Sequence, residues 1–274
     1  MQTIPTLTDR TTLPLRRARA TALFLQHDAV SEVQERLIEV NRTFTAPAIV
    51  TPFPTIWSGM ANAVVVPDDE VLALRPGAHD LVIHAMALHW ANDPVGQLVQ
   101  CRHALRPDGL FMGLMFGGRT LHELRTCLAE AEAVVTGGLS PRVLPMGEIR
   151  DLGGLLQRAG FALPVADSFT KTVTYRDAFH LMADLRAMGE GNALALRLRK
   201  PTRRAVFSTA AALYHAQFGT TDGRIPATFE IISLTGWAAH DSQQKPMRPG
   251  SAAARLADAL NTAEAPLPRD ATDG

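Results

Sequence analysis

The chain has 274 residues, of which 46% are hydrophobic and 20% charged, and its 27 basic and 27 acidic residues balance to a net charge of zero. This length suits one large domain or two small ones and is enough to bury a substantial core. The zero net charge gives no reason to expect a nucleic-acid surface or an anionic membrane as a partner. We expect no membrane span, because no apolar run approaches ~18 residues. The two cysteines, Cys101 and Cys127, lack metal-ligand spacing, so we expect reduced thiols and no metal site.

The N-terminal segment carries several arginines and lacks the apolar stretch of a secretory signal peptide. We expect a cytoplasmic bacterial protein; a mitochondrial matrix protein is the alternative, if the arginine-rich start is a transit peptide. Residues 1–13 are polar and are predicted to be a loose arm. Residues 15–40 have apolar positions at helical spacing. Residues 1–45 are therefore predicted to form an arm and a helix ahead of the main domain.

Two short strands are predicted next. Residues 46–51 form a β-prone run that ends at Pro52 and Pro54, and residues 63–67 form a second run. An acidic stretch, which begins with Asp68 and Asp69, follows the second run directly.

The clearest pattern lies in residues 80–116. The apolar run 80–85 predicts a buried strand, and Asp93 and Pro94 predict the N-cap and first residue of a helix. Residues 106–109 predict a turn before a second buried strand at 110–116. Strand, helix and strand together make a βαβ unit, which builds a parallel sheet.

The remaining chain continues to alternate between helices and strands. Helices are predicted from Thr120, which we expect to cap the first of them, and over 146–159, 177–188 and 203–218. Strands are predicted over 161–175 and 227–237, with Gly160 ending the helix before the first. The predicted inward-facing residues of strand 161–175 and of the following helix are Val165, Phe169, Val173 and Tyr175, and Phe179, Met182 and Leu185.

These elements predict an α/β fold. The main domain would span 46–252, with a helical insertion at about 177–218 before the last strand. A short helical patch is predicted at 252–260, and residues 253–274 are predicted to be a flexible tail.

Segments from Asp80 onward resemble one branch of the class I, Rossmann-like, S-adenosylmethionine-dependent methyltransferases. They cover about two thirds of the chain, in the family's order. The most particular are 188–190 (MGE), 226–228 (PAT) and 250–252 (GSA), whereas the RPDG turn at 106–109 is common to many methyltransferases. The others are 88–93 (LHWAND), 116–118 (FGG), 138–142 (GLSPR) and 151–161 (DLGGLLQRAGF).

The branch includes the biotin-pathway malonyl carrier-protein methyltransferases and the methyltransferase-like assembly factor of respiratory complex I (NADH:ubiquinone oxidoreductase). Its mitochondrial member hydroxylates an arginine on an iron–sulfur subunit. The resemblance implies a class I methyltransferase sheet, S-adenosylmethionine as cofactor and a complex I subunit as protein partner.

The N-terminal third departs from the family pattern. The family places a glycine loop after its first strand and an acidic residue at the end of its second. Here Pro52, Phe53 and Pro54 occupy the place of the loop, and only Gly59 follows before residue 63. A βαβ unit needs ~30 residues, which the spacing does not provide. We therefore predict a sheet truncated in its N-terminal half and a degenerate cofactor site; an unusual but competent loop is the alternative.

The resemblance and the ends of the predicted strands supply candidate site residues, although no catalytic residue is predicted. Asp68 and Asp69 match the family's acidic position near the adenine, and His89 and Trp90 follow a strand at the edge where α/β sheets bind ligands. The substrate or partner candidates are Asp93, Gly117, Gly118, Arg142, Glu190, Asn192 and Gln243. For these residues the alternative is a purely structural role, such as capping a helix, connecting a strand to a helix or holding the inserted helices against the sheet.

Two functions are consistent with these observations. One is a non-catalytic assembly protein, a pseudoenzyme that grips a complex I subunit with the methyltransferase scaffold and its inserted helices. The other is an active enzyme, either an S-adenosylmethionine-dependent methyltransferase or an arginine hydroxylase, acting on a protein or a small molecule. The missing glycine loop favours the first.

Overall fold

The computed structural model describes residues 6–243. Met1–His240 form one compact unit and Asp241–Gly274 a second. The helices and strands of the described residues lie in the first unit. The strands are β1 (Pro47–Val50), β2 (Val64–Val66), β3 (His79–Ala85), β4 (Leu105–Phe116), β5 (Phe161–Tyr175) and β6 (Ile225–Ala238). The helices are α1 (Thr12–Arg17), α2 (Phe24–Val40), α3 (Pro94–Ala104), α4 (His122–Thr136), α5 (Ile149–Arg158), α6 (Ala178–Ala187) and α7 (Arg204–Phe218), with short 3-10 helices η1 (Pro54–Trp57) and η2 (Leu88–Trp90).

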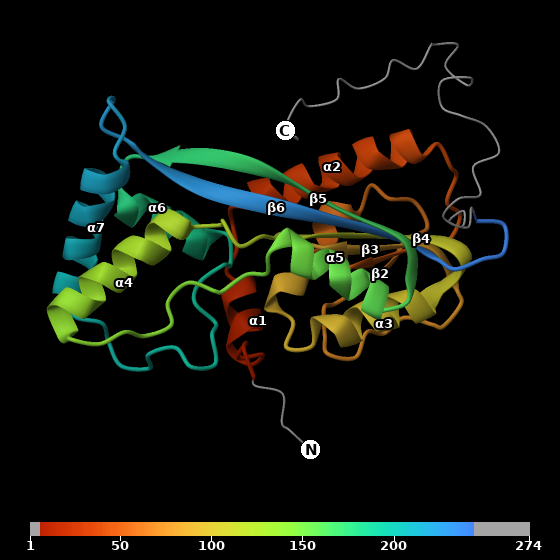
Figure 1. Ribbon diagram of the computed structural model, residues 1–274, viewed down its shortest axis with the longest axis horizontal. Coiled ribbons are helices and arrows are strands. Elements are labelled where there is room, and N and C mark those ends of the chain that lie inside the picture. The colour runs from red at the N-terminus through yellow and green to blue at the C-terminus, as the bar shows by residue number, and fades with distance from the viewer. Residues whose placement is uncertain (1–5, 244–274) are drawn as a thin grey trace, which may run out of the picture. The chain divides into compact units, whose positions relative to one another are not determined.

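The strands form one sheet with the order β2-β1-β3-β4-β6-β5 (Figure 1). Strands β1 to β4 are mutually parallel, whereas β6 runs antiparallel to both of its neighbours, β4 and β5. The unit β3–α3–β4 is the βαβ unit that the sequence predicts, with Asp93 as N-cap of α3 and Pro94 at its start. The predicted α/β, Rossmann-like fold is confirmed.

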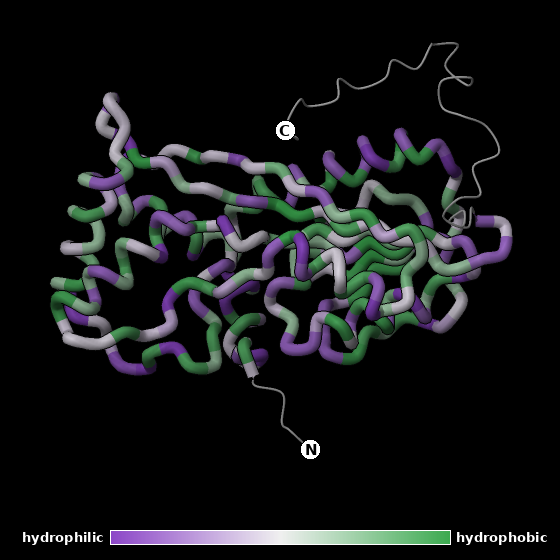
Figure 2. Tube along the Cα trace, viewed as in Figure 1, coloured by the Kyte–Doolittle hydropathy of each residue, from purple (hydrophilic) through white to green (hydrophobic). Residues whose placement is uncertain are grey.

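Both faces of the central strands are covered by helices. In β3, Leu81 and Ile83 pack in one cluster with Ala29 of α2, whereas Val82 packs in another with Leu98 of α3. This alternation follows from the opposite directions of successive side chains in a strand. Figure 1 shows α2 on one face and α3 and α5 on the other, and Figure 2 shows hydrophobic residues concentrated in the strands between them. Burial on both faces explains the nearly continuous apolar run of β3.

The inserted helices lie beside an extension of the two antiparallel strands. Pairing of β4 with β6 ends at Phe116 and Ile231, whereas β5 and β6 stay paired as far as Tyr175 and Ile225. Helices α6 and α7 connect β5 to β6, and α7 packs against α4 beside this extension (Figure 1). The predicted insertion before the last strand is thereby confirmed.

The N-terminal half of the sheet is short, as the sequence predicts. Residues 51–63 join β1 to the neighbouring parallel strand β2 and contain only the 3-10 helix η1. Within the described residues, β2 is the edge of the sheet. No full helix therefore separates these two strands.

The start of the chain differs from the prediction. A loose arm over residues 1–13 is wrong for residues 6–13: Leu13 is fully buried, and the backbone N–H of Asp9 donates to the carbonyl of Ala193 at 2.8 Å. The helix predicted over 15–40 is two helices, α1 and α2, with a break over 18–23. The arm is ordered because Leu13 packs with Leu144 and Leu194, which lie far along the chain.

Three local predictions are also wrong. The hydroxyl of Thr120 does not cap α4; it donates to the carbonyl of Glu230 at 3.0 Å, and the helix begins two residues later. Val165 is 55% exposed, because a β-bulge between Ala162 and Val165 shifts the strand's register. Phe179 is 50% exposed, since α6 instead buries Ala178, Leu181 and Leu185.

Gly160 has a φ of +82° directly after α5, as expected for the residue that ends that helix. The helical patch at 252–260 and the flexible tail at 253–274 lie outside the described residues.

Candidate functional site

The candidate site lies at the carboxyl edge of the parallel strands. There β2 is followed by Asp68, β3 by the turn that carries His89 and Trp90, and β4 by Gly117. Ligands of open α/β sheets bind at this edge.

Asp68 is engaged by arginines from the N-terminal segment. Nη1 of Arg17 donates to both carboxylate oxygens of Asp68 at 2.8 and 2.9 Å, and Nη1 of Arg10 donates at 3.2 Å. Arg17 and Asp68 are both buried. Burial alone would raise the pKa of Asp68, but the two guanidinium groups outweigh it and hold the pKa below its usual value. Asp69 is exposed, and its carbonyl accepts a hydrogen bond from Gln97 at 3.0 Å.

The segment in place of a glycine loop is packed with large side chains. Phe53 and Trp57 are 7% and 2% exposed, and Trp57 belongs to the core cluster of α2. Pro54 begins η1. Large buried side chains thus stand where the family has glycines, which let the backbone approach the cofactor.

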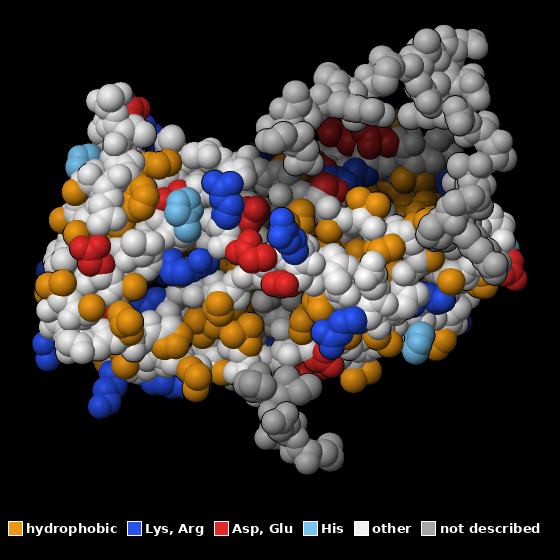
Figure 3. Space-filling model, viewed as in Figure 1, with side chains coloured by type: hydrophobic (Ala, Val, Ile, Leu, Met, Phe, Trp, Pro, Cys, Tyr) orange, Lys and Arg blue, Asp and Glu red, His pale blue; other side chains and the backbone are white. Residues whose placement is uncertain are grey.

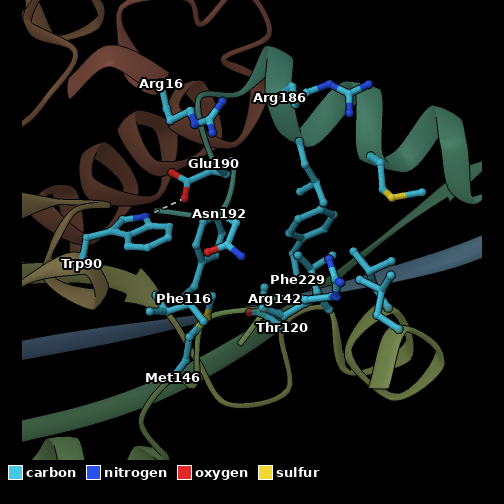
Figure 4. A pocket seen from close by; sticks show the side chains of 18 of the residues that line it. Arg16, Trp90, Phe116, Thr120, Arg142, Met146, Arg186, Glu190, Asn192 and Phe229 are labelled. Atoms are coloured by element: carbon cyan, nitrogen blue, oxygen red, sulfur yellow. Dashed lines mark hydrogen bonds between the residues drawn. The ribbon is translucent and has the colours of Figure 1, made fainter. Parts of the chain in front are cut away.

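A cavity of about 340 Å³ lies between this edge and the inserted helices (Figure 4). Its walls are mainly apolar and come from the end of β4, from α4, α6 and α7, and from the segment 142–146. The apolar residues are Trp90, Phe116, Leu121, Leu124, Leu128, Val143, Leu144, Met146, Met182, Leu185, Phe207 and Phe229; the others are Arg16, Thr120, Arg142, Arg186, Glu190, Gly191 and Asn192.

Glu190 joins the cavity to the carboxyl edge. Its Oε2 accepts a hydrogen bond from Nε1 of Trp90 at 2.7 Å and lies 3.7 Å from Nε2 of His89 (Figure 4 shows the Trp90 bond). The distance to His89 is too long for a hydrogen bond, so its interaction with Glu190 is electrostatic. Burial would raise the pKa of Glu190, but His89, Arg17 and the indole N–H keep it below its usual value. Glu190 is therefore ionised at neutral pH.

Arg142 and Asn192 reach the same cavity but also tie the chain together. Arg142 binds both carboxylate oxygens of Glu132, at 2.6 and 2.8 Å, and this is the main reason that the pKa of Glu132 falls to about 2. Asn192 donates to the carbonyl of Pro141 at 2.9 Å and accepts from the N–H of Leu194.

The two glycines after β4 have structural partners. The N–H of Gly117 donates to the carbonyl of Glu230 at 2.9 Å, and a Cβ there would lie 2.5 Å from Oε2 of Glu230. The N–H of Gly118 donates to the carbonyl of Gly147 at 3.1 Å. Both backbone N–H groups are therefore engaged within the strand-to-helix connection.

Asp93 does not line this cavity. The side chain of Asp93 accepts from the N–H of Gly96 at 2.8 Å, and Asp93 lines a second cavity, of about 330 Å³, with Arg10 and Glu70. Gln243 belongs to the second unit. The structure thus brings Trp90, Arg142, Glu190 and Asn192 to one cavity, with His89 behind them, and separates Asp68, Asp69 and Asp93 from it.

Arg16 and Arg17 contact this region but were not among the predicted site residues, because the arginines of the N-terminal segment suggested only a transit peptide. The sequence did offer one signal: two adjacent arginines lie shortly after Leu13, an apolar residue that is buried in the structure. Within residues 6–243, no three His, Cys, Asp or Glu side chains converge on a position that could hold a metal ion. No helix among these residues is long and apolar enough to cross a membrane.

The chain is similar in sequence to known mitochondrial proteins. The chain is 41% identical over 194 residues to the mitochondrial arginine-hydroxylase NDUFAF5 of Danio rerio. The matched region covers 71% of this chain and 60% of that protein. It is 42% identical over 188 residues to NDUFAF5 of Homo sapiens, covering 69% and 54%. The chain is homologous to these proteins. The resemblance stated from the sequence is confirmed.

A second group of relatives is more distant. The malonyl-[acyl-carrier protein] O-methyltransferase of Laribacter hongkongensis is 36% identical over 177 residues, covering 65% of this chain and 57% of that enzyme. The chain spans 45% to 60% of the length of its arginine-hydroxylase relatives. No protein-family model matches the chain. A crystal structure from Bacillus halodurans described as a methyltransferase has 13% identity and a TM-score of 0.48, over 75% of this chain and 98% of that one.

Proposed function

We propose that this homologue works without S-adenosylmethionine, as an assembly protein that holds a subunit of respiratory complex I. The observation that carries the proposal is the buried pair of Arg17 with Asp68. Asp68 stands at the acidic position expected near the cofactor, and Arg17, a cation from the first helix of the same chain, binds its carboxylate.

Two further features support the absence of a cofactor. The family's cofactor needs glycines after the first strand and a ribose-binding carboxylate at the end of the second. Phe53 and Trp57 stand at the first place, and the shortened sheet has no counterpart of the second among the described residues. Asp68, at the position that meets the adenine, is neutralised by Arg17 and Arg10. Losing such contacts costs on the order of 1–3 kcal/mol each, which together would abolish useful affinity.

The proposed partner comes from the relationship to NDUFAF5 proteins and from the complex I assembly role of that branch. This chain has the inserted helices α6 and α7 and the MGE segment at 188–190, which resembles that branch. They are the parts that would grip the subunit. The protein would act in the cytoplasm of a bacterium, or in the mitochondrial matrix if its start serves as a transit peptide.

The second candidate is an enzyme, either a methyltransferase or an arginine hydroxylase. It is favoured by the buried His89 and Glu190, 3.7 Å apart, behind a cavity large enough for a small molecule. A carboxylate beside an imidazole is a common acid–base arrangement. This candidate requires a co-substrate, and residues 51–58 offer no cradle for S-adenosylmethionine.

A thermal-shift titration with S-adenosylmethionine and S-adenosylhomocysteine separates the two candidates. A ligand that binds only the folded state adds ~2.7 kcal/mol at a hundredfold excess over its Kd. We expect no shift at millimolar ligand and, in parallel, co-purification of the full chain with a complex I subunit. A homologous methyltransferase that retains the glycine loop is the positive control. A clear shift at micromolar ligand would reinstate the enzyme, and failure to retain any complex I subunit would contradict the assembly role.

A further inference from the structure

The cavity beside α4, α6 and α7 has a chemistry of its own. We propose that it binds a small amphipathic anion, a molecule with one negatively charged head and an apolar body. This binding goes beyond the proposed assembly role and does not depend on it, because the cavity is separate from the Arg17–Asp68 pair.

The apolar body would lie against the deep wall of the cavity. Phe116 and Phe229 are 3% and 1% exposed, and Leu124 and Leu128 of α4 continue the same surface. Phe207 of α7 also lines the cavity. A volume of about 340 Å³ is within the range of small-molecule pockets, which are mostly apolar with a few placed polar groups.

The charged head would lie at the end where Arg16 and Arg186 reach the cavity (Figure 4). Within residues 6–243, neither guanidinium forms an ion pair, and Nε of Arg16 is buried without a hydrogen-bond partner. An unpaired buried donor is costly unless a ligand or a water satisfies it. An anion is the group that satisfies a guanidinium best.

The balance of charge also favours an anion. Arg142 is neutralised by Glu132, and the one carboxylate in the lining, Glu190, already accepts the bond from Trp90. Two unpaired arginines therefore outweigh one engaged carboxylate. A cationic guest of the same shape would be repelled by both arginines. On the face drawn in Figure 3, apolar side chains are widespread over the α4 and α7 part of the molecule, and a few Lys or Arg side chains lie among them.

Isothermal titration with three probes of equal chain length tests the proposal: octanoate, octanol and octylammonium. We expect octanoate to bind the full chain with a Kd below about 1 mM, and at least about tenfold more tightly than octylammonium. Octanol should fall between them. Equal binding of the anion and the cation, or no binding of octanoate at this level, would overturn the proposal.

Variants locate the binding. Two substitutions, Arg16→Gln and Arg186→Gln at an exposed position of α6, should each raise the Kd for octanoate by about tenfold. Neither should change the Kd for octanol. Arg158→Gln is the matched control, because this exposed arginine of α5 does not line the cavity. Circular dichroism of each variant checks that it folds. If Arg158→Gln weakens octanoate binding as much as Arg186→Gln does, the anion binds outside this cavity and the proposal fails.

Discussion

The indole Nε1 of Trp90 donates a hydrogen bond to Oε2 of Glu190 at 2.7 Å, although the two residues are 100 positions apart in the chain. Trp90 stands at the carboxyl edge of the sheet, and Glu190 begins the segment after the first inserted helix. This bond therefore fastens the insertion to the central sheet at the wall of the cavity.

Replacing Trp90 with phenylalanine should destabilise the protein more than the same change at Trp57. Both indoles are buried, but Nε1 of Trp57 has no hydrogen-bond partner, whereas Nε1 of Trp90 satisfies a buried carboxylate. The loss of packing is similar, so the difference reports the hydrogen bond. We expect Trp90→Phe to lose about 1–3 kcal/mol more than Trp57→Phe. Urea denaturation measures both, and equal losses would show that the bond contributes nothing.

Replacing Arg17 with methionine should destabilise the protein by up to about 3–5 kcal/mol, because it leaves the buried carboxylate of Asp68 with only its longer contact to Arg10, at 3.2 Å. The double variant Arg17→Met with Asp68→Leu should recover much of this loss, since it removes both charges. Denaturant unfolding of the wild type, the two single variants and the double variant gives the coupling free energy between the side chains of Arg17 and Asp68. Additive losses would mean that the two side chains do not interact.

The pair of Arg142 with Glu132 should make stability depend on pH in the acid range. The pKa of Glu132 in the folded state is lowered to about 2 from 4.5. A lowered pKa in the folded state gives stability that is present above pH 4.5 and is lost as the pH falls toward 2. Arg142→Gln should remove on the order of 1–3 kcal/mol of stability at neutral pH, and much less near pH 2.

Guanidinium-induced unfolding of the wild type and of Arg142→Gln at several pH values measures this difference. Other acids, Asp68 and Glu190 among them, titrate in both proteins and cancel in the comparison. A difference that stays constant from pH 6 to pH 2 would contradict the prediction.

Alanine should be tolerated at Gly118 but not at Gly117. A Cβ at Gly117 would lie 2.5 Å from Oε2 of Glu230 and 2.7 Å from Cδ1 of Ile232. Glu230 cannot move freely, because the same oxygen accepts from the N–H of Arg119 at 2.9 Å. We expect Gly117→Ala to cost about 1–3 kcal/mol.

A Cβ at Gly118 would meet only the end of the exposed side chain of Glu148, which can swing away. The loss from Gly118→Ala should therefore stay below about 1 kcal/mol. Thermal unfolding of the two variants tests the order, and a larger loss at Gly118 would reverse the interpretation.

Much of the fold could be predicted from local patterns. The βαβ unit of β3, α3 and β4 follows from an apolar run, the Asp93 cap and Pro94, all of which act on their own neighbours in the chain. The truncated start of the sheet follows from the two prolines and the short spacing to β2. Where periodicity failed, a tertiary feature intervened: the bulge after Ala162 turns Val165 outward, and the contacts of α6 select Leu181 instead of Phe179.

The sequence by itself determined the α/β class, the relationship to methyltransferase-fold proteins and the absence of a glycine loop, because each depends on residue types at short spacing. Only the tertiary structure decided that Asp68 faces Arg17, 51 positions away, and that Arg16 and Arg186 share a cavity. Helical and strand periods specify which face of an element is buried, but they do not specify which other element covers it. That choice depends on packing between segments far apart in the chain, and it placed the N-terminal helix over the edge where a cofactor was expected.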